Sequence, residues 1–423
     1  NLYRKAYHVF AVLVFAAGMA VLPFIHLFMK NNSYSLSYIR VLYAMWLVRT
    51  VLSYLLTYRK SLLIADQKEY IASITGLILN VVSYLAIILL VTWEQNYLLA
   101  LGIGTVTEVV LNIWISWYVE QKYPFLRQRR KEKSTSSLTK RIVRDLKSLF
   151  ISRISEKMLY CTDNLIISGF IGVGTVGRYA NYCMITQAIS NILTILANTI
   201  QPTVGDYFTE KNRQRNYEIL RQLTFGFFCI ASVVSVGLFS LITPFVRDIW
   251  LGPSYELGWG ITVFCIVVLL VRIMGLPLSL VMGVTGLFEK EKNVGASSAL
   301  LNLIVSLALV KPYGMAGVLL GTLLSYLLQI LYRYIIYFRD FLEMPGEALR
   351  YAQDIGEYLA VIAGEVLLMQ KIVPLIYGAG GMLLFCVCFL LCIAIPLLLD
   401  LVIFGRGWRL QSIVTMVKGM RKA

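Results

Sequence analysis

Charged side chains lie close together inside an apolar stretch of the sequence, residues 152–170, which reads SRISEKMLYCTDNLIISGF. Wound as a helix, the stretch has one polar and one apolar face. The polar face includes Arg153, Glu156, Lys157, Tyr160, Asp163 and Asn164. A charge at the centre of a membrane span costs about 2.5–3.5 kcal/mol on insertion scales. Two compatible interpretations follow: an ion-pair network that fixes helix packing, or the wall of a substrate cavity.

Other apolar runs carry one charge each near the middle: Arg49, Glu108, Arg272 and Glu365. Neither arginine has a partner nearby in the sequence. A guanidinium offers five donors in a planar fork that suits phosphate. An anionic pyrophosphate or an acidic sugar would therefore suit the following candidate substrate-binding residues: Arg49, Arg153, Lys157, Tyr160, Asn164 and Arg272. The acidic candidates, for structural pairs or for a coupling proton or sodium ion, are Glu108, Glu156, Asp163 and Glu365.

The run at 178–203 is rich in amides, among them Asn181, Gln187 and Asn191. Buried amides commonly join helices in membranes, at about 0.6 kcal/mol each. Amides and aromatic residues such as Tyr179 and Tyr182 are also the groups that a sugar-binding wall would use.

The composition indicates what must position these residues. The chain has 423 residues, of which 58% are hydrophobic and 15% charged, and its mean hydropathy is +0.72. Soluble proteins carry about 25% charged residues, so an all-α polytopic membrane protein is expected. The seven cysteines lie in apolar runs without zinc-ligand spacing, and His8 and His26 are the only histidines. We therefore expect no metal site, no structural disulfide and no cofactor.

Apolar runs long enough to cross a bilayer occur twelve times. We expect spans at 6–29, 35–58, 70–93, 97–118, 148–171, 178–203, 222–246, 260–284, 293–311, 315–337, 357–376 and 378–404. Basic residues concentrate in the connections on the side of residue 1, so the positive-inside rule predicts that both ends are cytoplasmic. The net charge of +16 then reflects topology, and no nucleic-acid partner is expected.

Several segments resemble the polysaccharide and lipid-linked oligosaccharide flippases of the multidrug/oligosaccharidyl-lipid/polysaccharide exporter superfamily. They are NLYRKAY (1–7), SLLIADQKEYI (61–71), TDNLIISGFIGVGTVGRYANY (162–182), IQPTVGDYF (200–208) and KPYGMAGVLLGTLLS (311–325). The resemblance extends over essentially the whole chain and implies a two-lobed, MATE-like exporter fold. Members usually have two more spans at the N-terminus, fourteen in all. The sequence begins with Asn1 and shows no signal peptide, so we expect it to lack that first pair.

The resemblance implies a domain organisation. It comprises an incomplete first lobe of four spans at 1–121, a basic cytoplasmic linker at 122–147, a six-helix lobe at 148–337, a peripheral helix pair at 357–404 and a basic cytoplasmic tail at 405–423. The linker is also expected to meet anionic lipid headgroups.

The implied function is a flippase of the cytoplasmic membrane that translocates undecaprenyl-pyrophosphate-linked oligosaccharide repeat units for capsule, exopolysaccharide or O-antigen. Membrane lipids, a polysaccharide polymerase and chain-length machinery are further expected partners. The alternative in the same fold is a multidrug/cation antiporter, which favours acidic sites. A membrane glycan polymerase or ligase is disfavoured because the longest outer connection, 248–260, contains Asp248 and Glu256 but no histidine. We therefore expect a transporter and not an enzyme.

Overall fold

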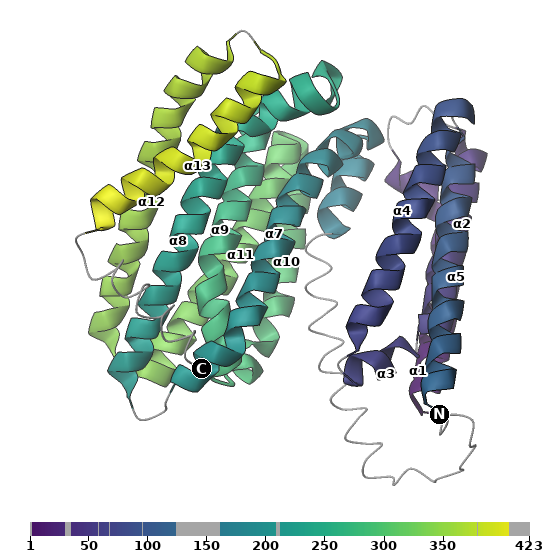
Figure 1. The fold of residues 1–423 in the computed structure, drawn as a ribbon, viewed down its shortest axis with the longest axis horizontal. Coiled ribbons are helices and arrows are strands. Elements are labelled where there is room, and N and C mark those ends of the chain that lie inside the picture. The colour runs from purple at the N-terminus through teal and green to yellow at the C-terminus, as the bar shows by residue number, and fades with distance from the viewer. Residues whose placement is uncertain are drawn as a thin grey trace. The chain divides into compact units, whose positions relative to one another are not determined.

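The chain divides into two compact units, Asn1–Thr139 and Lys140–Ala423 (Figure 1). The computed structural model describes residues 2–29, 35–57, 59–66, 68–94, 96–123, 161–208, 212–378 and 380–405. Most of the predicted linker at 122–147 and the tail at 405–423 lie outside these residues.

The first unit is a group of long helices. They are α1 (Leu2–Val21) with its 3₁₀ continuation η1 (Leu22–Phe28), α2 (Leu36–Thr57), the short α3 (Lys60–Ala65), α4 (Glu69–Glu94) and α5 (Tyr97–Lys122). Helix α1 packs on α2, and α5 packs on both α2 and α4. The Asn96 side chain caps α5 by accepting a hydrogen bond from the backbone N–H of Leu98.

The second unit begins, within the described residues, with a helical segment at 161–170. It continues with α7 (Val173–Tyr207), α8 (Arg213–Pro244), the π-helical η3 (Phe245–Trp250), the short η4 (Pro253–Tyr255), α9 (Trp259–Val284), α10 (Phe288–Tyr313), α11 (Met315–Ile335), the π-helical η5 (Ile336–Leu342), α12 (Pro345–Tyr377) and α13 (Met382–Phe404). Helix α8 packs against α9, α12 and α13 and is lined by buried apolar residues, so it forms the centre of this unit.

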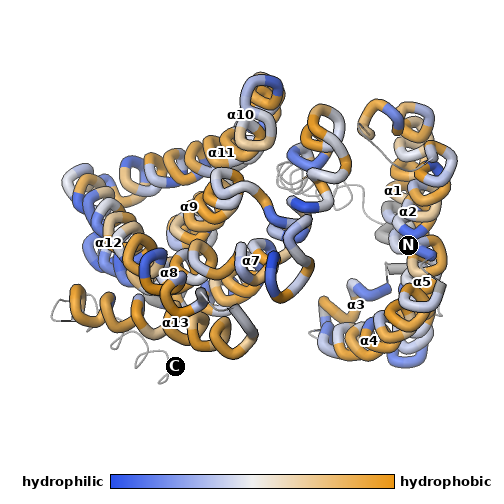
Figure 2. The backbone as a smooth tube through the Cα atoms, turned by 90° about the horizontal axis from the view of Figure 1, so that it is seen from above, coloured by the Kyte–Doolittle hydropathy of each residue, from blue (hydrophilic) through white to orange (hydrophobic). Residues whose placement is uncertain are grey.

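In the described part of the chain, ten helices are long and apolar enough to cross a membrane. Figure 2 shows hydrophobic residues along the length of these helices in both units. The ten correspond to ten of the predicted spans. Helix α2 corresponds to the predicted span at 35–58 and has 22 residues, but it is not among the ten. The predicted span at 148–171 lies largely outside the described residues. The chain is a multi-pass membrane protein.

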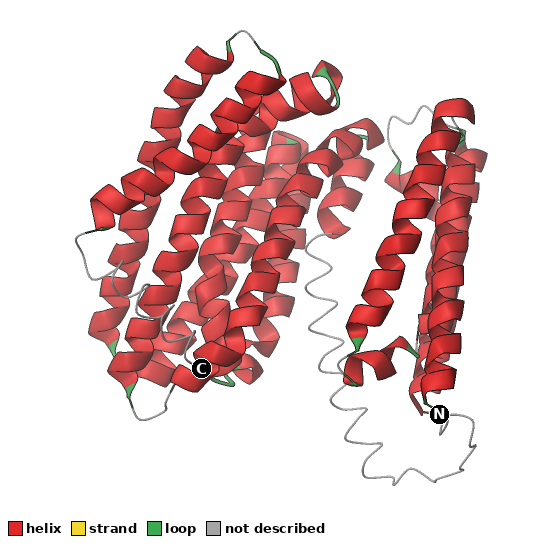
Figure 3. Ribbon diagram, viewed as in Figure 1, coloured by secondary structure: helices red, strands yellow, loops and turns green. Residues whose placement is uncertain are grey.

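Every regular element in the described ranges is helical, and no strand occurs there (Figure 3). The predicted all-α fold is thereby confirmed. Two helices begin well before their predicted apolar spans: α8 at Arg213 instead of 222, and α12 at Pro345 instead of 357. Their first turns carry charged residues. A hydropathy pattern therefore marks the apolar core of a helix and misses the polar turns that extend beyond it.

Helices α10 and α11 approach closely along two stripes of small and polar residues. These are Ser298, Asn302 and Ser306 on α10, and Gly317, Gly321 and Ser325 on α11. The Ser325 hydroxyl donates to the Ser298 carbonyl oxygen at 2.9 Å, and the Ser306 hydroxyl donates to the Val318 carbonyl oxygen at 3.2 Å. Helices in lipid associate through such close packing and interhelical hydrogen bonds.

The turn between α3 and α4 is joined to the end of α5 by a polar contact outside the spans. The Tyr123 hydroxyl donates to Asp66 Oδ2 at 2.5 Å, and Lys68 forms an ion pair with the same oxygen. The hydrogen bond from Lys68, and then that from Tyr123, hold the pKa of Asp66 below its ordinary value. A lowered folded-state pKa means that the contact stabilises the turn above the ordinary aspartate pKa.

We expect this stabilisation to be lost as the pH falls through the lowered pKa of Asp66. Amide hydrogen exchange of the turn, compared between wild type and Asp66→Asn at each pH, measures it. Wild type should be better protected near neutral pH, and the difference should vanish in acid. If the difference in protection between wild type and Asp66→Asn did not change with pH, the stabilisation could not come from the ionised Asp66 carboxylate.

Candidate functional site

A cavity of about 120 Å³ lies within the second unit, between the helical segment at 161–170, α7, α9 and α11. Its polar lining includes Asp163, Asn164, Gln187, Arg272, Thr322 and Tyr326. These side chains come from four helical segments, so the cavity exists only when the helices pack together.

Arg272 supplies the positive charge of the cavity. It lies on α9, and its guanidinium carbon is 5.4 Å from the centre of the Tyr326 ring on α11. This cation–π contact restricts the orientation of the guanidinium. One turn further along α9, Gly275 lets α11 approach: a Cβ there would lie 2.9 Å from Ile330 Cγ1. The close approach of α9 and α11 therefore brings Arg272 to Tyr326.

Asp163 is the acidic group of the cavity and is 4% exposed. The Thr322 hydroxyl donates to Asp163 Oδ2 at 2.6 Å, and Asn302 Nδ2 lies 3.4 Å from Asp163 Oδ1. Asn302 also donates to the Thr322 hydroxyl at 2.8 Å. The carboxyl is thus held by neutral donors on α10 and α11. A buried aspartate carboxyl at a cavity could bind a proton or a small monovalent cation.

The structure places three of the residues singled out from the sequence, Asp163, Asn164 and Arg272, around one cavity. Four others, Arg153, Glu156, Lys157 and Tyr160, lie outside the described residues. Of the amide-rich run, Gln187 lines the cavity, as does the aromatic Tyr179.

Sequence reasoning missed three residues of this site: Asn302, Thr322 and Tyr326. Asn302 and Thr322 are single neutral polar residues in apolar runs, which are common in membrane helices and give no strong signal. The spacing of Gly317, Gly321 and Ser325 could have indicated a close partner for α11.

Arg49 and Glu108 lie in the first unit and form an ion pair. Arg49 Nε is 2.7 Å from Glu108 Oε2, and the two side chains are 29% and 31% exposed. The Arg49 guanidinium also lies 5.1 Å from the Trp46 ring centre, and a Cβ at Gly104 would be 3.2 Å from its Nη1. The pair joins α2 to α5. That Arg49 binds substrate remains a prediction, in which an anion would have to compete with Glu108.

Exchanging the two charges tests this pair. Arg49→Ala should lower the free energy of unfolding by about 1.5–3 kcal/mol, because a hydrogen bond between charged groups is lost. The double variant Arg49→Glu with Glu108→Arg should recover most of that loss in thermal unfolding. A double variant no more stable than either single one would contradict a structural pair. Recovery of stability without recovery of transport would point to an anion-binding role for Arg49.

Glu365 lies away from this cavity, on α12. It is buried at 3% exposure and accepts a hydrogen bond from the Ser232 hydroxyl at 2.6 Å.

The chain is similar to known proteins in sequence and in fold. Residues 5–208 match the sequence model of the family described as "Polysaccharide biosynthesis protein", slightly less than half of the chain. The solved structure of "Lipid II flippase MurJ, inward closed conformation" superposes with a TM-score of 0.68 at 15% identity, covering 95% of this chain and 83% of that one. The family match covers the first part of the chain, and the structural match shows that the fold is shared over nearly its whole length. No curated protein sequence matches the chain.

The exporter fold is also seen in a second comparison. A mutant of the Vibrio cholerae MATE transporter VcmN superposes with a TM-score of 0.51 at 11% identity, covering 80% of this chain and 77% of that one. The family match ends at Phe208 and so includes Asp163, Asn164 and Gln187 but not Arg272 or Thr322. The cavity is therefore built from residues inside the matched region and residues beyond its end.

Proposed function

We propose that the chain is a flippase that moves undecaprenyl-pyrophosphate-linked oligosaccharide repeat units across the cytoplasmic membrane for capsule, exopolysaccharide or O-antigen assembly. The observation that carries this proposal is the match of residues 5–208 to the polysaccharide biosynthesis family. The fold shared with the lipid II flippase structure over 95% of the chain supports transport of a lipid-linked substrate.

In this proposal Arg272 binds an anionic group of the substrate. The cavity of about 120 Å³ is smaller than ordinary ligand pockets of about 300–1,000 Å³, so it fits a phosphate or part of one sugar. The guanidinium fork over Tyr326 suits a phosphate, and Asn164 and Gln187 supply amide groups of the kind that bind sugar hydroxyls. The lipid tail remains in the bilayer.

Asp163 is the proposed site of ion coupling. It lines the same cavity as Arg272, and its oxygens accept hydrogen bonds from Asn302 Nδ2 and the Thr322 hydroxyl. A proton or sodium ion bound there would change the charge of the cavity that holds the anionic substrate. Ion binding at Asp163 and substrate binding at Arg272 are then coupled by the electrostatic interaction between the two groups across the cavity.

The orientation and partners belong to the same proposal. The basic residues in the connections support both ends of the chain being cytoplasmic. A polysaccharide polymerase and chain-length machinery are the proposed partners on the outer side, because they would use the translocated repeat units.

A multidrug/cation antiporter is the second candidate. The buried Asp163 in the cavity and the similarity to the MATE transporter structure favour it. Such a protein would recognise a cation through an acidic group, and Arg272 would oppose that binding.

Complementation tests the two candidates. The chain is expressed in a strain that lacks its own oligosaccharide flippase, and surface polysaccharide is scored beside the amount of protein in the membrane. Recovery that depends on Arg272 supports the flippase. Well-inserted protein that gives no polysaccharide but removes a cationic dye from the cells would replace the proposal by an antiporter.

A further inference from the structure

Two buried carboxyl groups lie away from the cavity, where α12 and α13 pack on α8. Glu365 on α12 is 3% exposed and Asp400 on α13 is 4% exposed. The fully buried Ser232 of α8 donates to Glu365 Oε2 at 2.6 Å. Asp400 lies within electrostatic reach of Glu365 and beside Ser232. Glu365 and Asp400 therefore lie together beside Ser232, and we call these two carboxyl groups the acid pair.

Three oxygens of this cluster are buried with no hydrogen-bond partner among the described residues. They are Glu365 Oε1, Asp400 Oδ1 and Asp400 Oδ2. Native proteins satisfy nearly all their buried polar atoms. Two adjacent carboxylates in an apolar site would also repel each other, and such groups take up a proton instead. The orphaned oxygens thus point to a bound proton.

Among the residues that the structure describes, no basic side chain forms an ion pair with Glu365 or Asp400. Cys229 and Ser232 on α8 face the acid pair. Tyr358 lies two helical turns before Glu365 on α12, and Cys392 lies two turns before Asp400 on α13. The ion pair of Arg221 with Asp354 joins the same two helices 11 residues earlier on each, about 16 Å away along the helix axes. Arg221 is held there by two hydrogen bonds, of 2.6 and 3.0 Å, to the Asp354 carboxylate.

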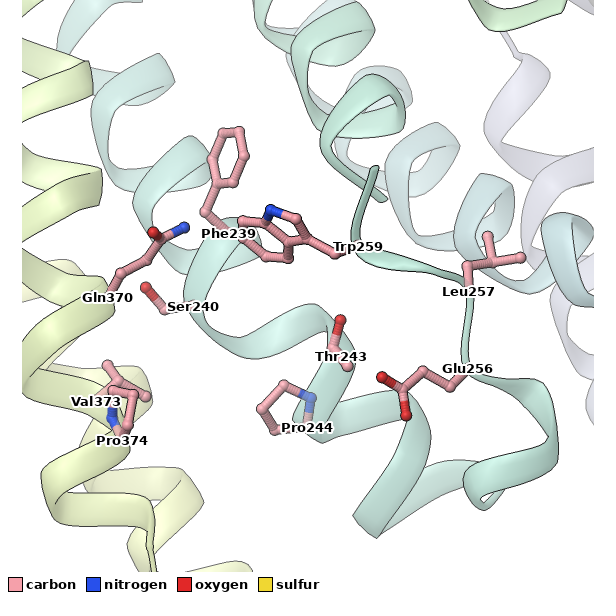
Figure 4. Close-up of a pocket in the computed structure, with 10 residues that line it drawn as sticks. All are labelled: Phe239, Ser240, Thr243, Pro244, Glu256, Leu257, Trp259, Gln370, Val373 and Pro374. Atoms are coloured by element: carbon pink, nitrogen blue, oxygen red, sulfur yellow. The ribbon is translucent and has the colours of Figure 1, made fainter. Parts of the chain in front are cut away.

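A second cavity of about 310 Å³ lies between α8, α12 and residues 256–259. Figure 4 shows Gln370 of α12 extending toward Ser240 of α8 at this cavity. Ser240 follows Ser232 by two helical turns, about 12 Å. Its hydroxyl oxygen is buried and has no partner among the described residues, and the Cys392 thiol lies beside it. Ser240 and Gln370 are thus the polar lining residues of this cavity that lie nearest, along α8 and α12, to Ser232 and Glu365.

Aromatic rings close the other side of the acid pair. Phe228 lies one turn before Ser232, and Phe404 lies one turn after Asp400. The Phe228 and Tyr358 rings stack with centroids 4.5 Å apart, and the Phe404 ring is 5.5 Å from that of Phe228. No polar path crosses this packing in the described residues.

We propose that Glu365 and Asp400 form a proton-binding site that is reached through the cavity at Ser240 and Gln370 and is closed on the opposite side by the aromatic cluster. The site holds at least one proton at neutral pH. That proton keeps α12 and α13 packed on α8, because its loss leaves two like charges buried side by side. The site is separate from the arginine cavity, so it does not depend on which substrate is moved.

Infrared spectroscopy of the purified full chain tests the proposal. At neutral pH, wild type should show a carbonyl band from a buried protonated carboxyl, and the double variant Glu365→Gln with Asp400→Asn should lose it. Deuterium exchange of the band should be several-fold slower in Ser240→Val, because that variant blocks the polar route. An unchanged band in the double variant would overturn the proposal. Loss of the wild-type band on adding sodium ions at constant pH would replace the proton by a metal cation.

Two measurements keep the test valid if the variants fold poorly. Labelling of wild type by a hydrophobic carbodiimide, which reacts with protonated carboxyls, should map to Glu365 or Asp400 by mass spectrometry. The thermal midpoint of wild type should fall as the pH rises, because the folded state binds a proton that the unfolded state releases. The double variant should lack this fall. Absence of both the label and the pH dependence in wild type would contradict the site, whatever the result of the complementation assay.

Discussion

Replacing Arg272 by alanine is expected to abolish glycan export while the amount of inserted protein stays normal. The guanidinium lies over Tyr326 in a cavity shared with Asn164 and Gln187. A charged hydrogen bond to an anionic ligand is worth about 1.5–3 kcal/mol, so binding should weaken roughly 10- to 150-fold. Surface polysaccharide in the complementation strain measures the effect, and a pyrophosphate titration of purified protein measures the affinity.

Two matched variants separate the charge from its geometry. Arg272→Lys keeps the charge but loses the planar fork, so export should be intermediate. Tyr326→Phe keeps the aromatic ring under the guanidinium and should stay near wild type. Export at the full rate by Arg272→Ala would show that this cavity does not bind the substrate.

Gly317→Ala is expected to destabilise the second unit strongly. A Cβ at this position would overlap the carbonyl group of Leu309 on α10, which is backbone and cannot rotate away. Overpacking costs about 1–3 kcal/mol, and a backbone contact lies at the upper end of that range. Separation of α10 from α11 would also break the hydrogen bond from Asn302 to the Thr322 hydroxyl, which itself donates to Asp163.

Gly364→Ala in α12 is the control for Gly317→Ala. Nothing lies within 4 Å of a Cβ at Gly364, so alanine there should be neutral or stabilise by about 0.4–1 kcal/mol through helix propensity. Thermal unfolding of both variants in the same detergent makes the comparison. Equal midpoints would mean that α10 and α11 can move apart without cost, and that the small-residue stripes do not fix their distance.

The sequence alone predicted a helix well where the helix coincides with a continuous run of apolar residues. The run at 260–284 is helix α9, Trp259–Val284, and the run at 378–404 contains α13, Met382–Phe404. The bilayer requires about 20 apolar residues in a helix, and this requirement can be read from a single segment. The first predicted span, 6–29, contains a change from α-helix to 3₁₀-helix at Leu22, next to Pro23, that hydropathy does not show.

The sequence also indicated part of the candidate site. Arg272 and Asp163 stood out because a charge in a span is costly, and this cost depends only on the residue and its place in the run. Asp400 was missed because it lies close to the end of an apolar run, where a charged residue can reach the membrane surface.

Only the tertiary structure decided which partner each charged residue has. Glu108 lies 59 residues after Arg49, and Thr322 lies 159 residues after Asp163. Nothing local in either segment encodes such a pairing, because it depends on which helix faces pack together. The helices of a membrane protein are determined segment by segment through their transfer into lipid, whereas its sites are determined by close packing between helices that are distant in the sequence.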